Sequence, residues 1–153
     1  MSTPEERLAD LGHAVPEVAA PVAAYVPAVR SGAHVFTSGQ LPMRSGELMA
    51  TGKVGGEVTA EEAYECAVQC ALNAIAAVRA EIGELSRVAR IVKVVCFVAS
   101  TPDFTGQPGV ANGASDFLVE ILGENGRHSR SAVGVPALPM DAAVEIEALF
   151  EVA

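Results

Sequence analysis

The C-terminal stretch HSRSAVGVPALPMDAAVEIEALFEVA, residues 128–153, decides the fold. Apolar and polar residues alternate on each side of its Leu-Pro turn, and this alternation predicts two β-strands. The first strand carries a single charge, Arg130, on a face that is otherwise made of small residues. The second strand has one apolar face, and its opposite face carries Glu145, Glu147 and Glu151. We therefore predict that a cation and an anion meet at the surface of a sheet.

The composition of the chain indicates one domain without a nucleic-acid partner. A length of 153 residues suits a single domain with a sizeable core. Only 5% of the residues are aromatic and none is tryptophan, so that core must be built from Ala, Val, Ile and Leu. The net charge of −9, from 10 basic and 19 acidic residues, comes without any basic run. Binding to a phosphate backbone depends on clustered cations, which argues against nucleic acid as a partner.

Other compositional signals indicate a reducing compartment and no bound cofactor. Cys66, Cys70 and Cys96 form no CxxC pair, and we expect all three to be buried thiols rather than redox groups or metal ligands. Residues 1–12 are acidic and lack the apolar core of a leader, and no apolar run approaches the ~18 residues of a membrane span. We predict a cytoplasmic protein without a membrane partner. No metal, flavin or nucleotide motif is present, so we expect neither a metal nor a cofactor.

Capping and turn signals divide the rest of the chain into elements. Thr3, Pro4 and Glu6 mark the start of a short helix that Gly12 ends. The later segments are predicted to be a hairpin of residues 25–30 and 33–38 around Ser31-Gly32, a loop of residues 42–56 with short paired pieces, a helix from Thr59 to Gly83, a strand of residues 88–99 and a helix of residues 108–122.

These elements predict an α+β architecture. Two long helices must cover one face of a sheet of five or six strands. We place Arg130 and the three glutamates on the second face of that sheet. Because the strand of residues 88–99 is apolar at nearly every position after Ile91, we expect other copies of the chain to cover this second face.

Several strings of residues resemble the RidA (YjgF) family of small proteins. Tyr25 precedes FTSGQLP, which begins at Phe36, and Gly32 lies between them at the family's turn position. VKVVCFVAS, followed by PDF, is similar to the family's central strand. RSAVGVPALPMDAAVEIEALFEV, which begins at Arg130, resembles the family's signature of an arginine, a Leu-Pro turn and an Ile-Glu pair at set spacing.

This resemblance runs from about residue 22 to the C-terminus. It divides the chain into an N-terminal extension with a short helix, residues 1–21, and a RidA-like domain, residues 22–153. It implies a chorismate-mutase-like (bacillus) fold, in which a sheet of about six strands carries two long helices on one face. It also implies a homotrimer whose three active sites lie in clefts between subunits.

Members of the family hydrolyse reactive enamines or imines to a 2-oxo acid and ammonia, and the resemblance implies the same activity here. Arg130 then holds the substrate carboxylate, and Glu145 positions the attacking water. The chemistry suits these residues, because a guanidinium clamps a carboxylate at two points and an imine needs mainly an oriented water. The expected substrate-binding residues of the cleft are Tyr25, Ser38, Gly39 and Ala132.

The chain departs from the family pattern at two single residues and in the loops of residues 43–58 and 101–110, which look longer and shape the cleft, and other functions stay open. Many members have a cysteine where this chain has Ala132, and the family's helix-start asparagine falls on Ala111 by ungapped counting although Asn112 is adjacent. His128 either stays in a loop or approaches the cleft. The alternative function is a non-catalytic trimeric module that binds a small carboxylate metabolite. Ribonuclease activity, an older label for the family, is disfavoured by the acidic charge.

Overall fold

The computed structural model describes residues 1–20 and 23–153. Along the chain its helices and strands are α1 (Pro4–Asp10), β1 (Ala28–Ser31), β2 (His34–Thr37), β3 (Met43–Arg44), β4 (Glu47–Leu48), α2 (Ala60–Ile82), β5 (Val88–Ala99), α3 (Gln107–Leu122), β6 (Ser129–Val135) and β7 (Val144–Val152). This order matches the predicted one, including the short paired pieces in the loop after β2.

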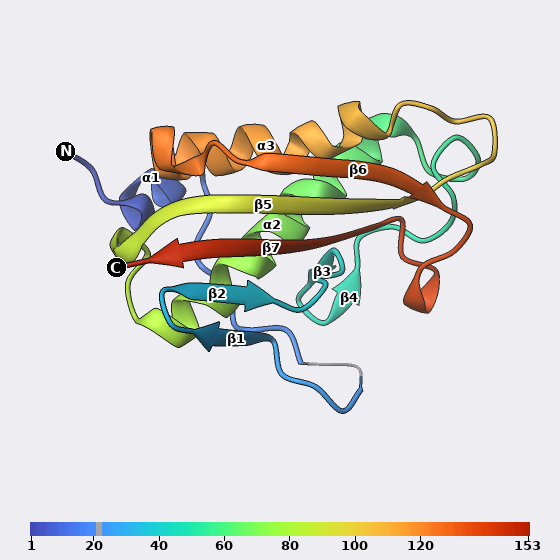
Figure 1. Cartoon of the computed structure of the whole chain (residues 1–153). Helices are drawn as coiled ribbons and strands as arrows, with labels where there is room; N and C mark the ends of the chain where they lie inside the picture. The colour runs from blue at the N-terminus through green and yellow to red at the C-terminus, as the bar shows by residue number, and fades with distance from the viewer. Residues whose placement is uncertain (21–22) are drawn as a thin grey trace.

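Five strands form the main sheet in the order β1-β2-β7-β5-β6 (Figure 1). β5 pairs with β6 in parallel and with β7 antiparallel. β3 and β4 form a separate two-stranded sheet. The expected α+β class is confirmed, and the main sheet has five strands where about six were predicted. β6 is an edge strand, and β5 lies between it and β7 although the two C-terminal strands follow one another in the sequence.

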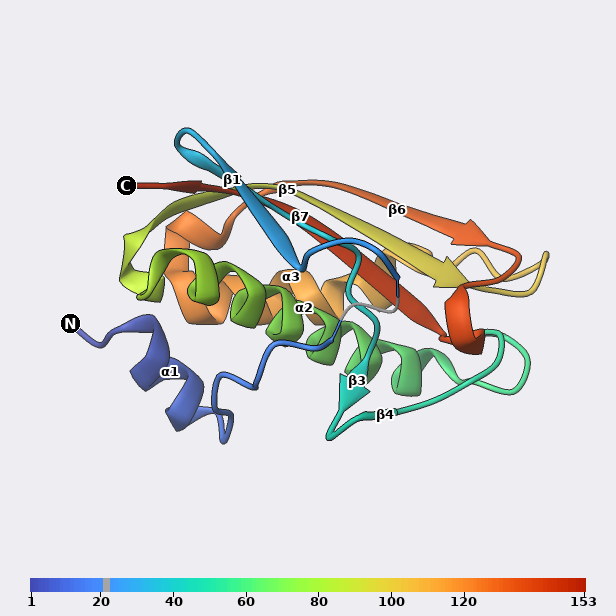
Figure 2. The ribbon, with the colours of Figure 1, turned by 90° about the horizontal axis from the view of Figure 1, so that it is seen from below.

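Helices α2 and α3 lie together under one face of this sheet (Figure 2). α2 begins where the Thr59 hydroxyl accepts a hydrogen bond from the backbone N–H of Glu62 at 3.1 Å. In a capping box the Glu62 carboxylate would accept from the backbone N–H of Thr59. Here it accepts from the Thr59 hydroxyl instead. Gly83 ends the helix with a φ of 89°, a conformation that other residues rarely adopt.

The alternation predicted for the last strand is confirmed in β7. Its buried side chains, which pack toward the helices, are Val144, Ile146, Ala148, Phe150 and Val152. The intervening residues of β7 face the opposite side of the sheet, which no other element of the described chain covers (Figure 2).

The predicted hairpin is present, but its first strand begins later than expected. The ladder starts at Ala28 instead of residue 25, because Pro27 has no N–H to donate. The turn consists of Gly32 and Ala33, since Ser31 and His34 still pair across the strands. Gly32 adopts a φ of 61° there.

The N-terminal helix α1 is anchored to the body of the protein. Both bonds of its predicted capping box are present, between Thr3 and Glu6. Leu8 is buried, and Arg7 donates a hydrogen bond of 2.9 Å to the backbone carbonyl of Ile121 at the end of α3. The proposed division of the chain between residues 21 and 22 falls on residues outside the described ones, so it stays a prediction. Within the described ranges, no helix has the length and apolarity that a membrane crossing requires.

Candidate functional site

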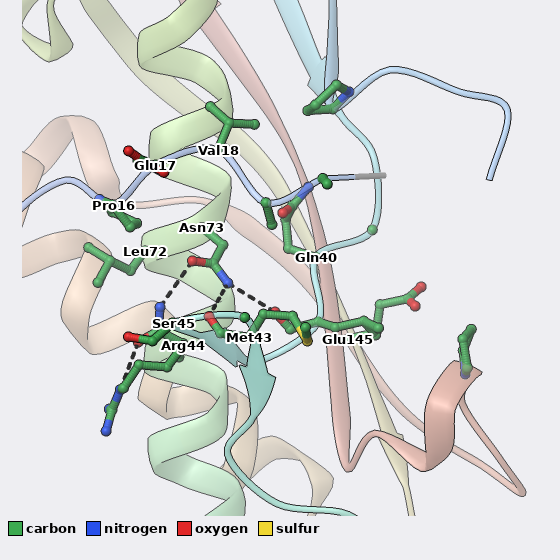
Figure 3. Close-up of a pocket in the computed structure, with 18 of the residues that line it drawn as sticks. Pro16, Glu17, Val18, Gln40, Met43, Arg44, Ser45, Leu72, Asn73 and Glu145 are labelled. Atoms are coloured by element: carbon green, nitrogen blue, oxygen red, sulfur yellow. Dashed lines mark hydrogen bonds between the residues drawn. The ribbon is translucent and has the colours of Figure 1, made fainter. Parts of the chain in front are cut away.

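A pocket of about 740 Å³ opens at the end of the sheet where β7 begins (Figure 3). Its walls come from the segment before β1, the β3–β4 hairpin, α2 and the start of β7. Three of the predicted site residues line it, namely Tyr25, Gly39 and Glu145. The structure therefore brings together one part of the predicted site.

Gly39 and Glu145 are held side by side by backbone pairing. Gln40 follows β2 and exchanges two backbone hydrogen bonds with Ile146, of 2.7 and 3.0 Å. A Cβ atom on Gly39 would lie 2.5 Å from Oε2 of Glu145. A side chain at residue 39 would therefore displace the Glu145 carboxylate from this position.

The environment of Glu145 favours its protonated form. Burial raises the pKa of this carboxyl, and the nearby charge of Glu147 raises it further. A carboxylate whose pKa moves toward neutrality is better suited to accept and return a proton. Glu151 has a different role, since it lies 3.9 Å from Arg90 in an exposed ion pair.

Ser38 shapes the pocket but does not line it. Its hydroxyl donates to the backbone carbonyl of Val26 at 2.5 Å, and its N–H donates to the carbonyl of Pro27 at 2.8 Å. These bonds fix the segment that carries Tyr25, whose side chain is 45% exposed at the pocket. In one chain, Ser38 thus acts on the site through the position of Tyr25.

The inner wall of the pocket is a polar pair on α2 that sequence reasoning missed. Asn73 is only 2% exposed and donates to the carbonyls of Leu41 and Met43, both at 3.0 Å. Gln69 donates to the Asn73 side chain at 3.0 Å and accepts from Arg44. The signal was two amides four residues apart in an otherwise apolar helix stripe.

Arg130 does not meet Glu145 within one chain, so the predicted cation–anion pairing at a single sheet surface is wrong. Arg130 pairs with Val94 of β5, which pairs with Ala148, so Arg130 lies on the side of the helices. Glu145 pairs with Phe97 on the opposite side. Two strand spacings and three residues along β5 also separate their Cα atoms by roughly 14 Å.

The Arg130 guanidinium is held against the first turns of α3. Its Nη1 donates to Oδ1 of Asn112 at 2.8 Å and to Oγ of Ser115 at 3.1 Å, and its Nη2 donates to the Pro108 carbonyl at 3.4 Å. Of the two candidates for the family's asparagine position, Asn112 makes this contact and Ala111 is buried. Arg130 forms no ion pair within the described residues.

The other predicted residues near Arg130 lie with it and away from the pocket. Ala132 pairs with Cys96 and packs partly against the core under the helices. His128 lies 2.9 Å from the Ser115 hydroxyl. Sequence reasoning missed Ser115, although its spacing of three residues from Asn112 places both side chains on one face of α3.

The three cysteines are buried free thiols, as predicted. Burial raises the pKa of Cys66 to about 11 and that of Cys96 to about 12. Burial also raises the pKa of Cys70 well above its usual value. Thiols in this state are poor nucleophiles at neutral pH. In the part of the chain that the structure describes, no three His, Cys, Asp or Glu residues are grouped to hold a metal ion.

Comparison with known proteins places the chain in a family. The model described as "YjgF/chorismate mutase-like, putative endoribonuclease" matches residues 5–152, and the chain belongs to this family. The expected RidA (YjgF) membership and chorismate-mutase-like fold are thereby confirmed. Protein TCP17 of Trypanosoma cruzi is 46% identical over 142 residues, which are 92% of this chain and 89% of that protein.

Two solved structures extend the comparison. The crystal structure of a "putative endoribonuclease" from Shewanella oneidensis MR-1 is 36% identical, with a TM-score of 0.96 over 99% of this chain and 100% of that chain. The crystal structure of Escherichia coli TdcF with bound serine is 27% identical, with a TM-score of 0.66 over 87% of this chain and 91% of that chain.

Proposed function

We propose that this protein hydrolyses reactive 2-imino and 2-enamino acids to 2-oxo acids and ammonia. The observation that carries the proposal is the state of Arg130. This half-buried cation is fixed by three hydrogen bonds and has no acidic partner among the described residues. A guanidinium has five N–H donors, so two remain for a ligand, and two are what a carboxylate engages.

Glu145 provides the second part of the chemistry. Water adds to the imine carbon while the Glu145 carboxylate accepts a proton from it. Glu145 returns this proton to the nitrogen, which gives a carbinolamine. It then takes the proton of the new hydroxyl and passes it to the nitrogen as well, so that the C–N bond breaks, ammonia leaves and the carbon keeps its oxygen as a carbonyl. The raised pKa of Glu145 favours this exchange, because a more basic carboxylate accepts a proton from water more readily.

We further propose that the complete site forms between subunits of a homotrimer. One small substrate cannot contact Arg130 and Glu145 of the same chain, because they lie on opposite sides of the sheet with β5 between their strands. The sheet face away from the helices exposes large apolar side chains: Val29 at 53%, Phe36 at 49% and Val133 at 44%. Large apolar side chains exposed on an otherwise uncovered sheet face suit contact with further copies.

The test of the activity is an imine hydrolysis assay. Purified protein should accelerate the loss of 2-iminopropanoate or 2-iminobutanoate generated in situ from the parent amino acid. Arg130→Ala should reduce the acceleration by about a hundredfold or more, because the carboxylate loses a charged two-point contact.

The matched control is Arg127→Ala, which removes an exposed arginine paired with Glu124 at 3.0 Å. This variant should behave as wild type. An inert wild-type protein, or an Arg130→Ala variant with full activity, would remove the proposal.

One observation favours a second candidate, the non-catalytic binding of a small carboxylate metabolite. TdcF of Escherichia coli was crystallised with serine, which carries a carboxylate. Binding alone requires Arg130 but not Glu145, so Glu145→Gln would leave such a function intact. The family description as an endoribonuclease is not favoured, because the net charge of −9 repels a phosphate backbone.

A further inference from the structure

The hydrogen bonds of Arg130 continue through Ser115 to a histidine. Ser115 Oγ lies 3.1 Å from Arg130 Nη1 and 2.9 Å from His128 Nε2. His128 Nδ1 in turn lies 2.6 Å from the backbone carbonyl of Gly126. Four residues from α3, the turn before β6 and β6 itself therefore form one continuous chain of polar contacts.

The position of each proton in this chain follows from the groups at its two ends. A backbone carbonyl only accepts, so His128 Nδ1 must carry a hydrogen. Burial, and then the charge of Arg130, lower the pKa of His128, so the ring is neutral at physiological pH and its Nε2 is an acceptor. Ser115 therefore donates to His128, and its oxygen is free to accept from Arg130.

We propose that Ser115 and His128 are positioning residues that hold the Arg130 guanidinium for the substrate carboxylate, and that they do so only while His128 is neutral. This inference rests on the proposed role of Arg130. A protonated His128 would direct a second cationic N–H at the Ser115 oxygen. The hydroxyl proton would lose its acceptor, and the two cations would repel each other across one oxygen atom.

Among the charged groups of the described residues, Arg130 is the one that shifts the pKa of His128. On α3, the charges of Asp116 and Glu120 instead raise the pKa of Tyr64 on α2. In the turn before β6, Glu124 is paired with Arg127.

On β5, Lys93 pairs with Ser129, so its side chain leaves the sheet on the side opposite Arg130. Protonation of His128 is therefore opposed by Arg130, and no carboxylate among the described residues offsets this effect. A bound substrate carboxylate would itself ease protonation of His128, so the expected dependence on neutral His128 comes from the Ser115 hydrogen bonds and not from charge.

The test compares Ser115→Ala and His128→Gln with wild type in the imine assay, on both sides of pH 6.5, the ordinary pKa of histidine. Ser115→Ala should raise KM about tenfold with little change in kcat, because it removes one of the bonds that fix a charged group used equally in ground and transition states. For wild type, KM should rise as the pH falls below 6.5.

His128→Gln separates positioning from a merely structural role. The glutamine carbonyl still accepts from Ser115 but does not titrate, so KM should stay near the wild-type value and lose its rise at low pH. His34→Gln, which changes an exposed histidine on β2, is the control and should keep the wild-type profile.

The outcomes distinguish this inference from the proposed function. Suppose that wild type is active. If Ser115→Ala then has the wild-type KM, or if the KM of His128→Gln still rises at low pH, the positioning role of Ser115 and His128 is wrong and the proposed function stands. If wild type is inert, binding of pyruvate and 2-oxobutanoate replaces the assay. If Ser115→Ala and low pH each weaken this binding, the positioning role is supported and the deaminase activity is rejected. If neither changes the binding, or if wild type does not bind, the positioning role and the deaminase activity are both overturned.

Discussion

At the scale of single residues, Glu145 occupies a place that suits chemistry better than stability. Burial and the charge of Glu147 raise the pKa of its carboxyl, and no cation or hydrogen-bond donor among the described residues lowers it. Gly39 has no side chain, and this leaves room for the carboxylate. An ionised group held without compensation is typical of functional sites.

Glu145→Gln should therefore stabilise the protein while removing its activity. The folded state raises the pKa above 4.5, so the stabilising contribution is complete below pH 4.5 and is lost as the pH rises through the raised pKa. At pH 7 the charge destabilises, and a glutamine carries none. We expect a higher Tm at pH 7, a gain that disappears below pH 4.5, and imine hydrolysis reduced by roughly 10²-fold or more.

Thermal unfolding at both pH values and the imine assay provide the measurement. Glu151→Gln is the control on the same face of β7, and it removes only an exposed ion pair with Arg90. A Glu145→Gln protein that is less stable than wild type at pH 7 would contradict the environment described for this carboxyl.

At the scale of elements, the contact between α2 and α3 depends on small residues. Alanine is the commonest buried residue of α2, at six of its fourteen buried positions. A Cβ on Gly113 of α3 would collide with the backbone carbonyl of Tyr64 and approach Ala67 to 3.2 Å. The backbones of the two helices are thus close enough that only glycine fits, and this closeness sets how α3 presents Asn112 and Ser115 to Arg130.

Gly113→Ala should destabilise the protein by about 1–3 kcal/mol, because overpacking forces the helices apart. The matched control is Gly109→Ala on the same helix, where nothing lies within 4 Å of an added Cβ. That variant should gain about 0.5–1 kcal/mol, since alanine favours helix over glycine. Urea unfolding of both variants measures the difference, and equal effects at the two positions would refute the close contact.

At the scale of the whole molecule, the two halves of the proposed site belong to different parts of the surface. The pocket with Glu145 lies where β7 begins, whereas Arg130 lies on the edge strand β6. Figure 1 shows β5 running between β6 and β7 along their length. A site that requires both residues must then be shared by two chains, and this makes it possible to complement one defective chain with another.

Mixing inactive Arg130→Ala and Glu145→Gln chains should restore activity. After joint unfolding and refolding in equal amounts, about one site in four receives its arginine from one variant and its glutamate from the other, given random assembly. We expect about a quarter of wild-type activity in the mixture and none in either variant alone. Light scattering should give the mass of a trimer. A monomer mass, or a mixture that stays inactive, would exclude a shared site.

Much of the molecule could be predicted from the sequence because its signals are local. The caps at Thr3 and Thr59, the end of α2 at Gly83 and the alternating faces of β7 each depend on residues a few positions apart. The buried thiols and the family strings are likewise properties of short segments. Tyr25, Gly39 and Glu145 were found in this way, and one pocket contains all three.

Three features depend on contacts between distant segments, namely the order of the strands, the insertion of β5 between β6 and β7, and the side of the sheet on which Arg130 lies. The alternation along β6 indicates which of its residues share a face, but not which face meets the helices. That choice depends on the register with β5, a strand more than thirty residues earlier in the chain. The same long-range pairing brings His128 and Ser115 to Arg130. This cluster could not be predicted, because a contact between distant segments leaves no periodic signal in the sequence of either segment.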